Sequence, residues 1–162
     1  MIESAHEWRW ILYALLLVAA VSDIQSMRIP NLIPLAVVGA LLAVLLITAA
    51  PPEAYMDAAL SSLIGLGVGY GFFRLKLMGG GDGKLFAASA AWFSAGALLS
   101  VGFFVSLAGI IVALAALAFR SVRPAAASPI GGRLRAALKA PIPYGVAIAV
   151  GVVIASQIPS LG

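Results

Sequence analysis

Long apolar stretches alternate with short polar connections along the whole chain. A helix that crosses a bilayer needs about 20 predominantly apolar residues. Six stretches fit this template, so the pattern predicts an all-α, polytopic membrane protein with about six transmembrane helices. The junction of the fourth and fifth stretches has neither charge nor proline, and we expect a tight turn within residues 98–102. The six predicted spans are residues 8–26, 30–50, 54–75, 84–100, 101–119 and 144–159.

The composition supports this class. Apolar residues make up 63% of the 162 residues and charged residues 10%, against typical values of about 45–50% and about 25% in soluble domains. So few charges cannot coat a water-soluble domain, which argues against a soluble enzyme and against a nucleic-acid-binding protein. The spans occupy most of the chain, so we expect a single membrane-embedded domain over residues 1–162.

The basic residues predict how the chain is oriented. Nine of the ten lie in the first, third and fifth connections, and by the positive-inside rule these connections face the cytoplasm. Both termini are then outside, in the periplasm. The fifth connection, residues 120–143, is a long basic loop that is either a short helix on the anionic inner leaflet or a solvated loop that only fixes topology. The nine bases are Arg28, Arg74, Lys76, Lys84, Arg120, Arg123, Arg133, Arg135 and Lys139.

Several kinds of chemistry are excluded by residues that the chain lacks. It has no cysteine, and its one histidine is His6. Disulfides, thiol nucleophiles, cysteine-ligated metals, HExxH zinc sites and Ser-His pairs are therefore ruled out. A phosphate-binding GxxxxGK[ST] loop aligned on Gly83 and Lys84 fails, because Met78 and Leu85 stand where glycine and Ser/Thr are needed. We therefore expect no metal, no cofactor and no nucleotide.

Two aspartates are the candidate chemical groups. Asp23 and Asp82 lie at the cytoplasmic ends of predicted spans, where ionisable residues are costly and rare. Two neighbouring carboxyl groups share one proton, so that one can take a proton from water while the other donates one. The alternative is a pair of interfacial aspartates that face water, with Asp82 acting as a helix N-cap.

Glycines mark two further features. Gly79, Gly80 and Gly81 directly precede Asp82, and we expect them to form a non-helical wall that another backbone can approach closely. The third span contains two GxxxG pairs, which predict close helix packing in lipid. These pairs are Gly65 with Gly69, and Gly67 with Gly71.

Three motifs give the chain a resemblance to a known family. Residues 23–31 read D-I-Q-S-M-R-I-P-N, residues 79–85 read G-G-G-D-G-K-L, and residues 143–147 read P-Y-G-V-A. These segments resemble the D-x4-R-I-P-N, GxGD-x-K-L and P-[YF]-G signatures of the type IV prepilin peptidases. The resemblance implies an aspartyl endopeptidase of the inner membrane that removes the short basic leader of prepilins or pseudopilins at the cytoplasmic face. Asp23 and Asp82 match the family's catalytic aspartates.

The resemblance also implies roles for nearby residues. Gly79, Gly80, Gly81 and Lys84 would form a supporting loop, in which the lysine either tunes the ionisation of the pair or binds a lipid phosphate. Longer family members carry a cysteine zinc site linked to N-methylation, and the absence of cysteine implies that methyltransferase activity is absent. The chain resembles the short branch that serves tight-adherence (Flp) pili, or archaeal preflagellin peptidases. A further group would either surround the catalytic residues as a second layer or anchor the chain, namely Arg28, Pro30 and Asn31.

Two other functions fit a small polytopic protein with two buried carboxyl groups. A transporter or proton-relay protein would use Asp23 and Asp82 as relay groups and predicts inverted repeats with helices broken at mid-membrane. A non-catalytic pilus-assembly scaffold predicts that Asp23 and Asp82 lie far apart. We expect membrane lipids and a prepilin or pseudopilin as partners, with no nucleic acid.

Overall fold

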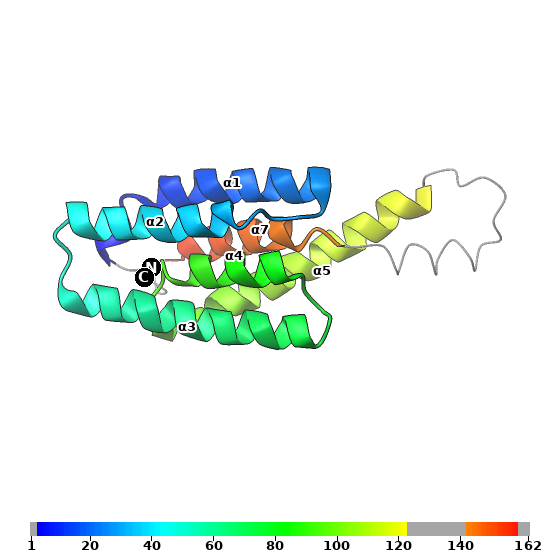
Figure 1. The fold of residues 1–162 in the computed structure, drawn as a ribbon. Helices are drawn as coiled ribbons and strands as arrows, with labels where there is room; N and C mark the ends of the chain where they lie inside the picture. Colours follow the sequence, from blue (N-terminus) through cyan, green and yellow to red (C-terminus); the bar gives the residue numbers. More distant parts are fainter. Residues whose placement is uncertain (1–2, 123–141, 159–162) are drawn as a thin grey trace.

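The computed structural model describes residues 3–122 and 142–158, and every regular element in these residues is a helix (Figure 1). The predicted all-α class is confirmed. The described residues form a helical bundle, and most of the helices lie along its long axis (Figure 1). The elements are η1 (Glu3–Ala5), α1 (Arg9–Ser26), α2 (Leu32–Ile47), α3 (Pro52–Arg74), α4 (Gly80–Ala90), η2 (Ala95–Ala97), α5 (Leu98–Val122) and α7 (Tyr144–Ser156).

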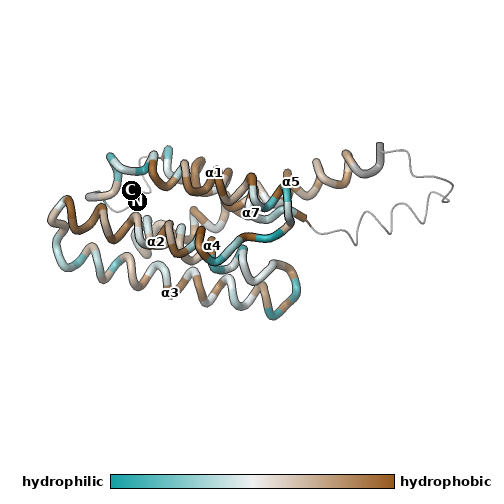
Figure 2. Tube along the Cα trace, turned by 45° about the horizontal axis from the view of Figure 1, so that its top comes forward, coloured by the Kyte–Doolittle hydropathy of each residue, from teal (hydrophilic) through white to brown (hydrophobic). Residues whose placement is uncertain are grey.

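Three stretches are long and apolar enough to cross a membrane, namely α1, α3 and residues 95–119, which combine η2 with most of α5. The shorter helices α2 and α7 are apolar as well. Figure 2 shows many hydrophobic residues along α1, α2 and α5, a paler α3, and hydrophilic residues in several connections. Large apolar side chains such as Leu17, Leu63 and Ile110 are exposed on the outside of the bundle. These features are those of a membrane protein, in which such side chains contact lipid.

The short helix α4 lies inside the bundle, packed against α2, α3 and α7. Helix α1 packs against α2 and α7, and α5 packs against α7. The helices α1 and α3 end, and α2, α4 and α7 begin, at one end of the bundle, which we call the site end (Figure 1). The described chain begins and finishes near the opposite end, where α2 connects to α3. The predicted basic loop at 120–143 lies almost entirely outside the described residues.

The boundary between the fourth and fifth spans differs from the prediction. A turn was expected within residues 98–102, but α4 ends at Ala90 and α5 begins at Leu98. The break contains Trp92 and Phe93, both fully buried, and the indole Nε1 of Trp92 donates to the carbonyl oxygen of Val37 at 3.2 Å. Tertiary packing of two large aromatic rings sets this boundary, and a uniformly apolar stretch carries no local signal for it.

Close packing by Gly65 and Gly69 is confirmed. A Cβ atom added to Gly65 would lie 2.8 Å from the Cβ of Ala90, and one added to Gly69 would lie 2.8 Å from the Cα of Gly83. Real Cβ atoms are not found so close to other heavy atoms. The backbones of α3 and α4 therefore approach to a distance that only glycine permits at these positions.

Close packing by Gly67 and Gly71 is not found among the described residues. A Cβ atom at either position would meet nothing within 4 Å. Residues two apart on a helix point in nearly opposite directions, so only one of the two GxxxG pairs can face α4. Another close contact joins α5 and α7, where a Cβ on Gly151 would overlap the backbone of Val105.

Candidate active site

Asp23 lies in the last turn of α1, and its side chain is 4% exposed. Its carboxylate faces the first turn of α7. The backbone N–H of Gly145 donates to Oδ2 of Asp23 at 2.7 Å, and the N–H of Val146 also donates to this carboxylate. The first N–H groups of a helix lack partners within the helix and carry partial positive charge. The amino terminus of α7 is therefore a preformed partner for the Asp23 carboxylate.

A tight reversal after α1 fixes this geometry. Met27 adopts a left-handed conformation with φ of 51°, and its N–H donates to the carbonyl oxygen of Asp23 at 2.8 Å. The hydroxyl groups of Ser22 and Ser26 donate to the carbonyl oxygen of Arg28 at 3.1 and 3.2 Å. The chain thus turns directly toward α2.

Ile29 follows this reversal and is 8% exposed. A Cβ atom added to Gly81 would lie 3.1 Å from the carbonyl oxygen of Ile29, and one added to Gly145 would lie 2.9 Å from its Cδ1. Gly81 directly precedes Asp82, and Gly145 donates to Asp23. Ile29 is therefore packed between the first turns of α4 and α7, next to both aspartates.

Asp82 lies in the first turn of α4, outside the three candidate spans, and is partly buried. The N–H of Gly79 donates to its Oδ2 at 3.1 Å. Burial raises the pKa of Asp82 to about 6; the nearby charge of Asp23 adds to this rise, and the bond from Gly79 opposes it. The charge of Asp23 thus acts on Asp82, although the two residues lie on different helices and far apart in sequence. This interaction differs from what the scaffold interpretation predicts.

Two of the three glycines before Asp82 are helical, which corrects two expectations. Gly79 is extended and caps α4, while Gly80 and Gly81 already lie in the helix, so the run is not a non-helical wall. Asp82 is also not the N-cap; it is the third helical residue and accepts a hydrogen bond from the cap. The expected close approach is nevertheless present, because Gly81 contacts the backbone of Ile29.

The two main motifs meet through a side-chain hydrogen bond. Nζ of Lys84 donates to Oδ1 of Asn31 at 2.9 Å. Asn31 stands at the N-cap of α2, yet its side chain makes no capping bond there. Pro30 and the Arg28 side chain are exposed. Lys84 therefore has a protein partner that the sequence analysis did not predict.

Gly145 and Ile29 were not among the residues singled out by sequence. Gly145 belongs to the third quoted motif, and Ile29 to the first. Their contact with the aspartates could not be derived from the motifs, because Gly145 and Asp23 are 122 residues apart. Across the described part of the chain, no three His, Cys, Asp or Glu side chains are grouped so that they could hold a metal ion.

Two neighbouring carboxyl groups that are buried or partly buried can share a proton and activate water for hydrolysis. Comparison with known proteins agrees with a hydrolytic role. The model of the type IV leader peptidase family matches residues 10–114, a range that includes both Asp23 and Asp82. No curated protein and no solved structure matches the chain.

Proposed function

Because this chain belongs to the type IV leader peptidase family, whose substrates are of the prepilin type, we propose that it is an aspartyl endopeptidase in which Asp23 and Asp82 activate water. It removes the short basic leader from prepilins or pseudopilins. The observation that supports the proposal is the electrostatic effect of Asp23 on Asp82 at the site end, although the two residues lie on different helices, α1 and α4.

The chemistry requires one shared proton on the pair. The ionised carboxylate takes a proton from water as the water oxygen attacks the carbonyl carbon of the scissile peptide bond. The protonated carboxyl donates its proton to the carbonyl oxygen. When the C–N bond breaks, the first carboxyl protonates the leaving nitrogen, and the second takes a proton back from the intermediate. The pair returns to its starting state without a metal or cofactor.

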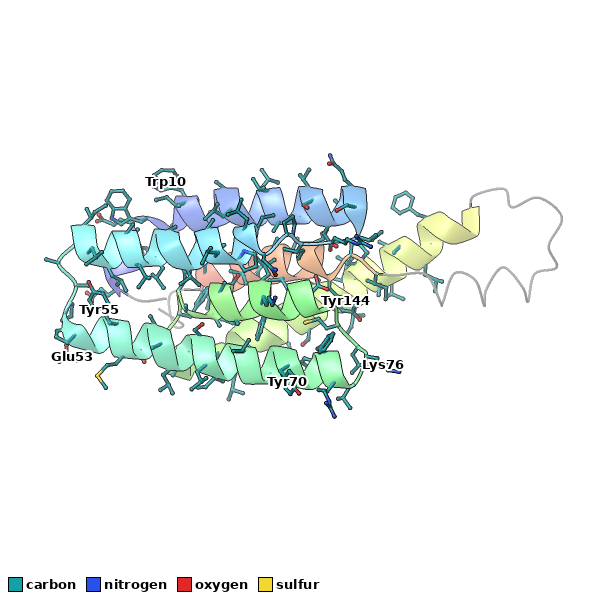
Figure 3. All side chains as sticks on the ribbon, viewed as in Figure 1. Trp10, Glu53, Tyr55, Tyr70, Lys76 and Tyr144 are labelled. Carbon is teal, nitrogen blue, oxygen red and sulfur yellow. The ribbon has the colours of Figure 1, made fainter. Side chains whose placement is uncertain are left out.

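The bases at the site end favour a cytoplasmic active site in the inner membrane. Arg28, Arg74, Lys76 and Lys84 all lie at or next to helix ends there, and Figure 3 shows Lys76 and Tyr144 on that side. Glu53 and Tyr55 lie toward the opposite end in the same view. By the positive-inside rule the basic end faces the cytoplasm. The peptide bond between a basic leader and an apolar helix would lie at this depth.

We propose peptide hydrolysis alone, without methyl transfer, because the chain has no cysteine for the zinc site linked to that activity. The function is tested by mixing the purified protein in liposomes with a tight-adherence prepilin that carries its leader. Mass spectrometry should find one cut before the apolar helix, unaffected by a chelator and by serine-protease inhibitors. Intact substrate with several prepilins, given a folded protein, would contradict the proposal.

A further inference from the structure

The two aspartates have unequal surroundings, and their hydrogen bonds distinguish them. We propose that the amino terminus of α7 holds Asp23 as the ionised member of the pair, so that Asp23 is the general base and Asp82 the general acid. Gly145 is then a positioning residue that acts through Asp23. This inference rests on the proposed function and assigns the roles within it.

Hydrogen bonds to the carboxylates favour a charge on Asp23. Asp23 accepts from the N–H groups of Gly145, at 2.7 Å, and Val146. Both belong to the first turn of a helix of 13 residues, whose dipole adds to the stabilisation of an anion. Asp82 accepts one bond, from Gly79, at the longer distance of 3.1 Å. Donors that satisfy an anion stabilise the ionised form, and the shorter bond from Gly145 therefore favours a charge on Asp23 over one on Asp82.

The other charged groups at the site end do not reverse the preference for a charge on Asp23. The charge of Asp23 adds to the rise in the pKa of Asp82. Lys84 on α4 donates to Asn31, and the Arg28 side chain is exposed. The titratable groups that the helices bring to this end in the described residues are Arg28, Arg74, Lys76, Asp82, Lys84 and Tyr144. The raised pKa of Asp82, about 6, agrees with a carboxyl that keeps its proton while its neighbour is charged.

Only glycine fits at position 145. An added Cβ would lie 2.9 Å from Oδ2 of Asp23, 3.0 Å from its Cβ and 2.9 Å from Cδ1 of Ile29. A side chain there would push the carboxylate away from the N–H groups that hold it. The absence of a side chain at Gly145 is therefore what allows the amino terminus of α7 to contact Asp23 directly.

Infrared spectroscopy of the carboxyl groups tests the assignment without any substitution at Gly145. At a pH a little below 6, the wild-type protein should show a protonated carboxyl band. Asp82→Asn should remove the band, because Asp23 stays ionised. Asp23→Asn should keep a protonated carboxyl band with its midpoint moved to lower pH, because Asp82 stays buried but loses the neighbouring charge of Asp23. A band that persists in Asp82→Asn would overturn the inference, because Asp23 would then hold the proton.

Gly145→Ala tests the positioning role. We expect kcat to fall about a hundredfold with KM nearly unchanged, as for a reacting group displaced by about 1 Å. The acid limb of the pH profile, which reports loss of the ionised base, should move to higher pH. Gly109→Ala is the matched control, because an added Cβ there makes only an ordinary contact of 3.9 Å with Ala147. A fall in kcat with an unmoved acid limb would contradict the positioning role.

A second variant shows whether Gly145→Ala acts through its overlap with Asp23 or through its overlap with Ile29. Ile29→Val removes the Cδ1 atom that the new methyl group of Gly145→Ala would meet, but leaves the overlap with Asp23. The double variant should therefore stay as impaired as Gly145→Ala, and full recovery would overturn the inference. The proposed function fails separately, either if the folded wild-type protein cleaves no prepilin or if Asp23→Asn or Asp82→Asn still cleaves one.

Discussion

Nζ of Lys84 donates a hydrogen bond to Oδ1 of Asn31 at 2.9 Å, and this bond joins the two motif segments that carry the aspartates. Asn31 begins α2 just after the loop that contains Ile29, and Lys84 lies two residues after Asp82 on α4. The bond therefore holds the first turn of α4 against the loop that packs beside Asp23. We expect its role to be the relative placement of the two carboxyl groups.

Removal of either partner of this bond should reduce cleavage. Lys84→Ala and Asn31→Ala should each lower kcat about five- to tenfold, since a hydrogen bond to a charged group contributes about 1.5–3 kcal/mol when intact and less when exposed. The double variant should lose no more than the worse single variant, because both remove one interaction. Kinetic assays of the four proteins give the coupling, with Lys76→Ala as a control that keeps wild-type kcat. Fully additive losses would mean that the two residues act separately.

The pH dependence of cleavage should follow the raised pKa of Asp82. A pair that works with one shared proton loses its acid once Asp82 ionises, at a pKa of about 6. We expect kcat/KM to be highest in weakly acid solution and to fall as the pH rises through this value. Initial rates across this range, in liposomes of fixed composition, provide the measurement. A rate that still increases well above pH 6 is the contrary result.

The ionised side chain of Asp82 should lower the stability of the folded protein in neutral solution. Its pKa is raised by folding, so the folded protein binds this proton more tightly than the unfolded chain does. The stabilisation is present below the ordinary pKa of 3.8 and is lost as the pH rises through about 6. Asp82→Asn keeps an acceptor for the N–H of Gly79 and carries no charge, so its Tm should exceed that of the wild type at pH 7. Thermal unfolding in detergent should show this gain shrinking toward acid pH, and a lower Tm at pH 7 would contradict it.

The packing of α3 on α4 gives a matched pair of substitutions. Gly69→Ala should destabilise the fold by about 1–3 kcal/mol, as overpacking does, because the new Cβ would lie 2.8 Å from the Cα of Gly83. Gly67→Ala lies on the open side of the same helix and should leave stability unchanged or slightly higher. Tm values for both variants provide the comparison. Equal losses would show that α3 does not pack as described.

The sequence predicted the helical class and most helix positions, because apolar periodicity and polar connections are local signals. It also singled out Asp23 and Asp82, because charged residues are rare among so many apolar ones. The break near Trp92 could not be predicted, since it depends on the burial of two aromatic rings and on the bond from the Trp92 indole to Val37 of α2. The glycines before Asp82 were predicted to form a loop, yet Gly80 and Gly81 are helical.

The surroundings of the aspartates depend on contacts between distant segments. No local sequence pattern indicates that the N–H of Gly145 donates to Asp23, or that Lys84 donates to Asn31. The third motif pointed to residues 143–147, but assigned them no partner. Topology decides such contacts, since α7 begins at the end of the bundle where α1 ends.

Asp23 and Asp82 are proposed to act as one catalytic pair, and prepilin cleavage by their Asn variants shows whether both carboxyl groups are required. Asn keeps the size and the hydrogen-bond acceptor of each side chain but cannot take or give a proton in this chemistry. Asp57→Asn, near the opposite end of the bundle, is the matched control. Prepilin cleavage in liposomes should persist in Asp57→Asn and fall at least about a hundredfold in Asp23→Asn and in Asp82→Asn. Cleavage at the wild-type rate by Asp23→Asn or by Asp82→Asn would show that the two carboxyl groups do not act as a catalytic pair.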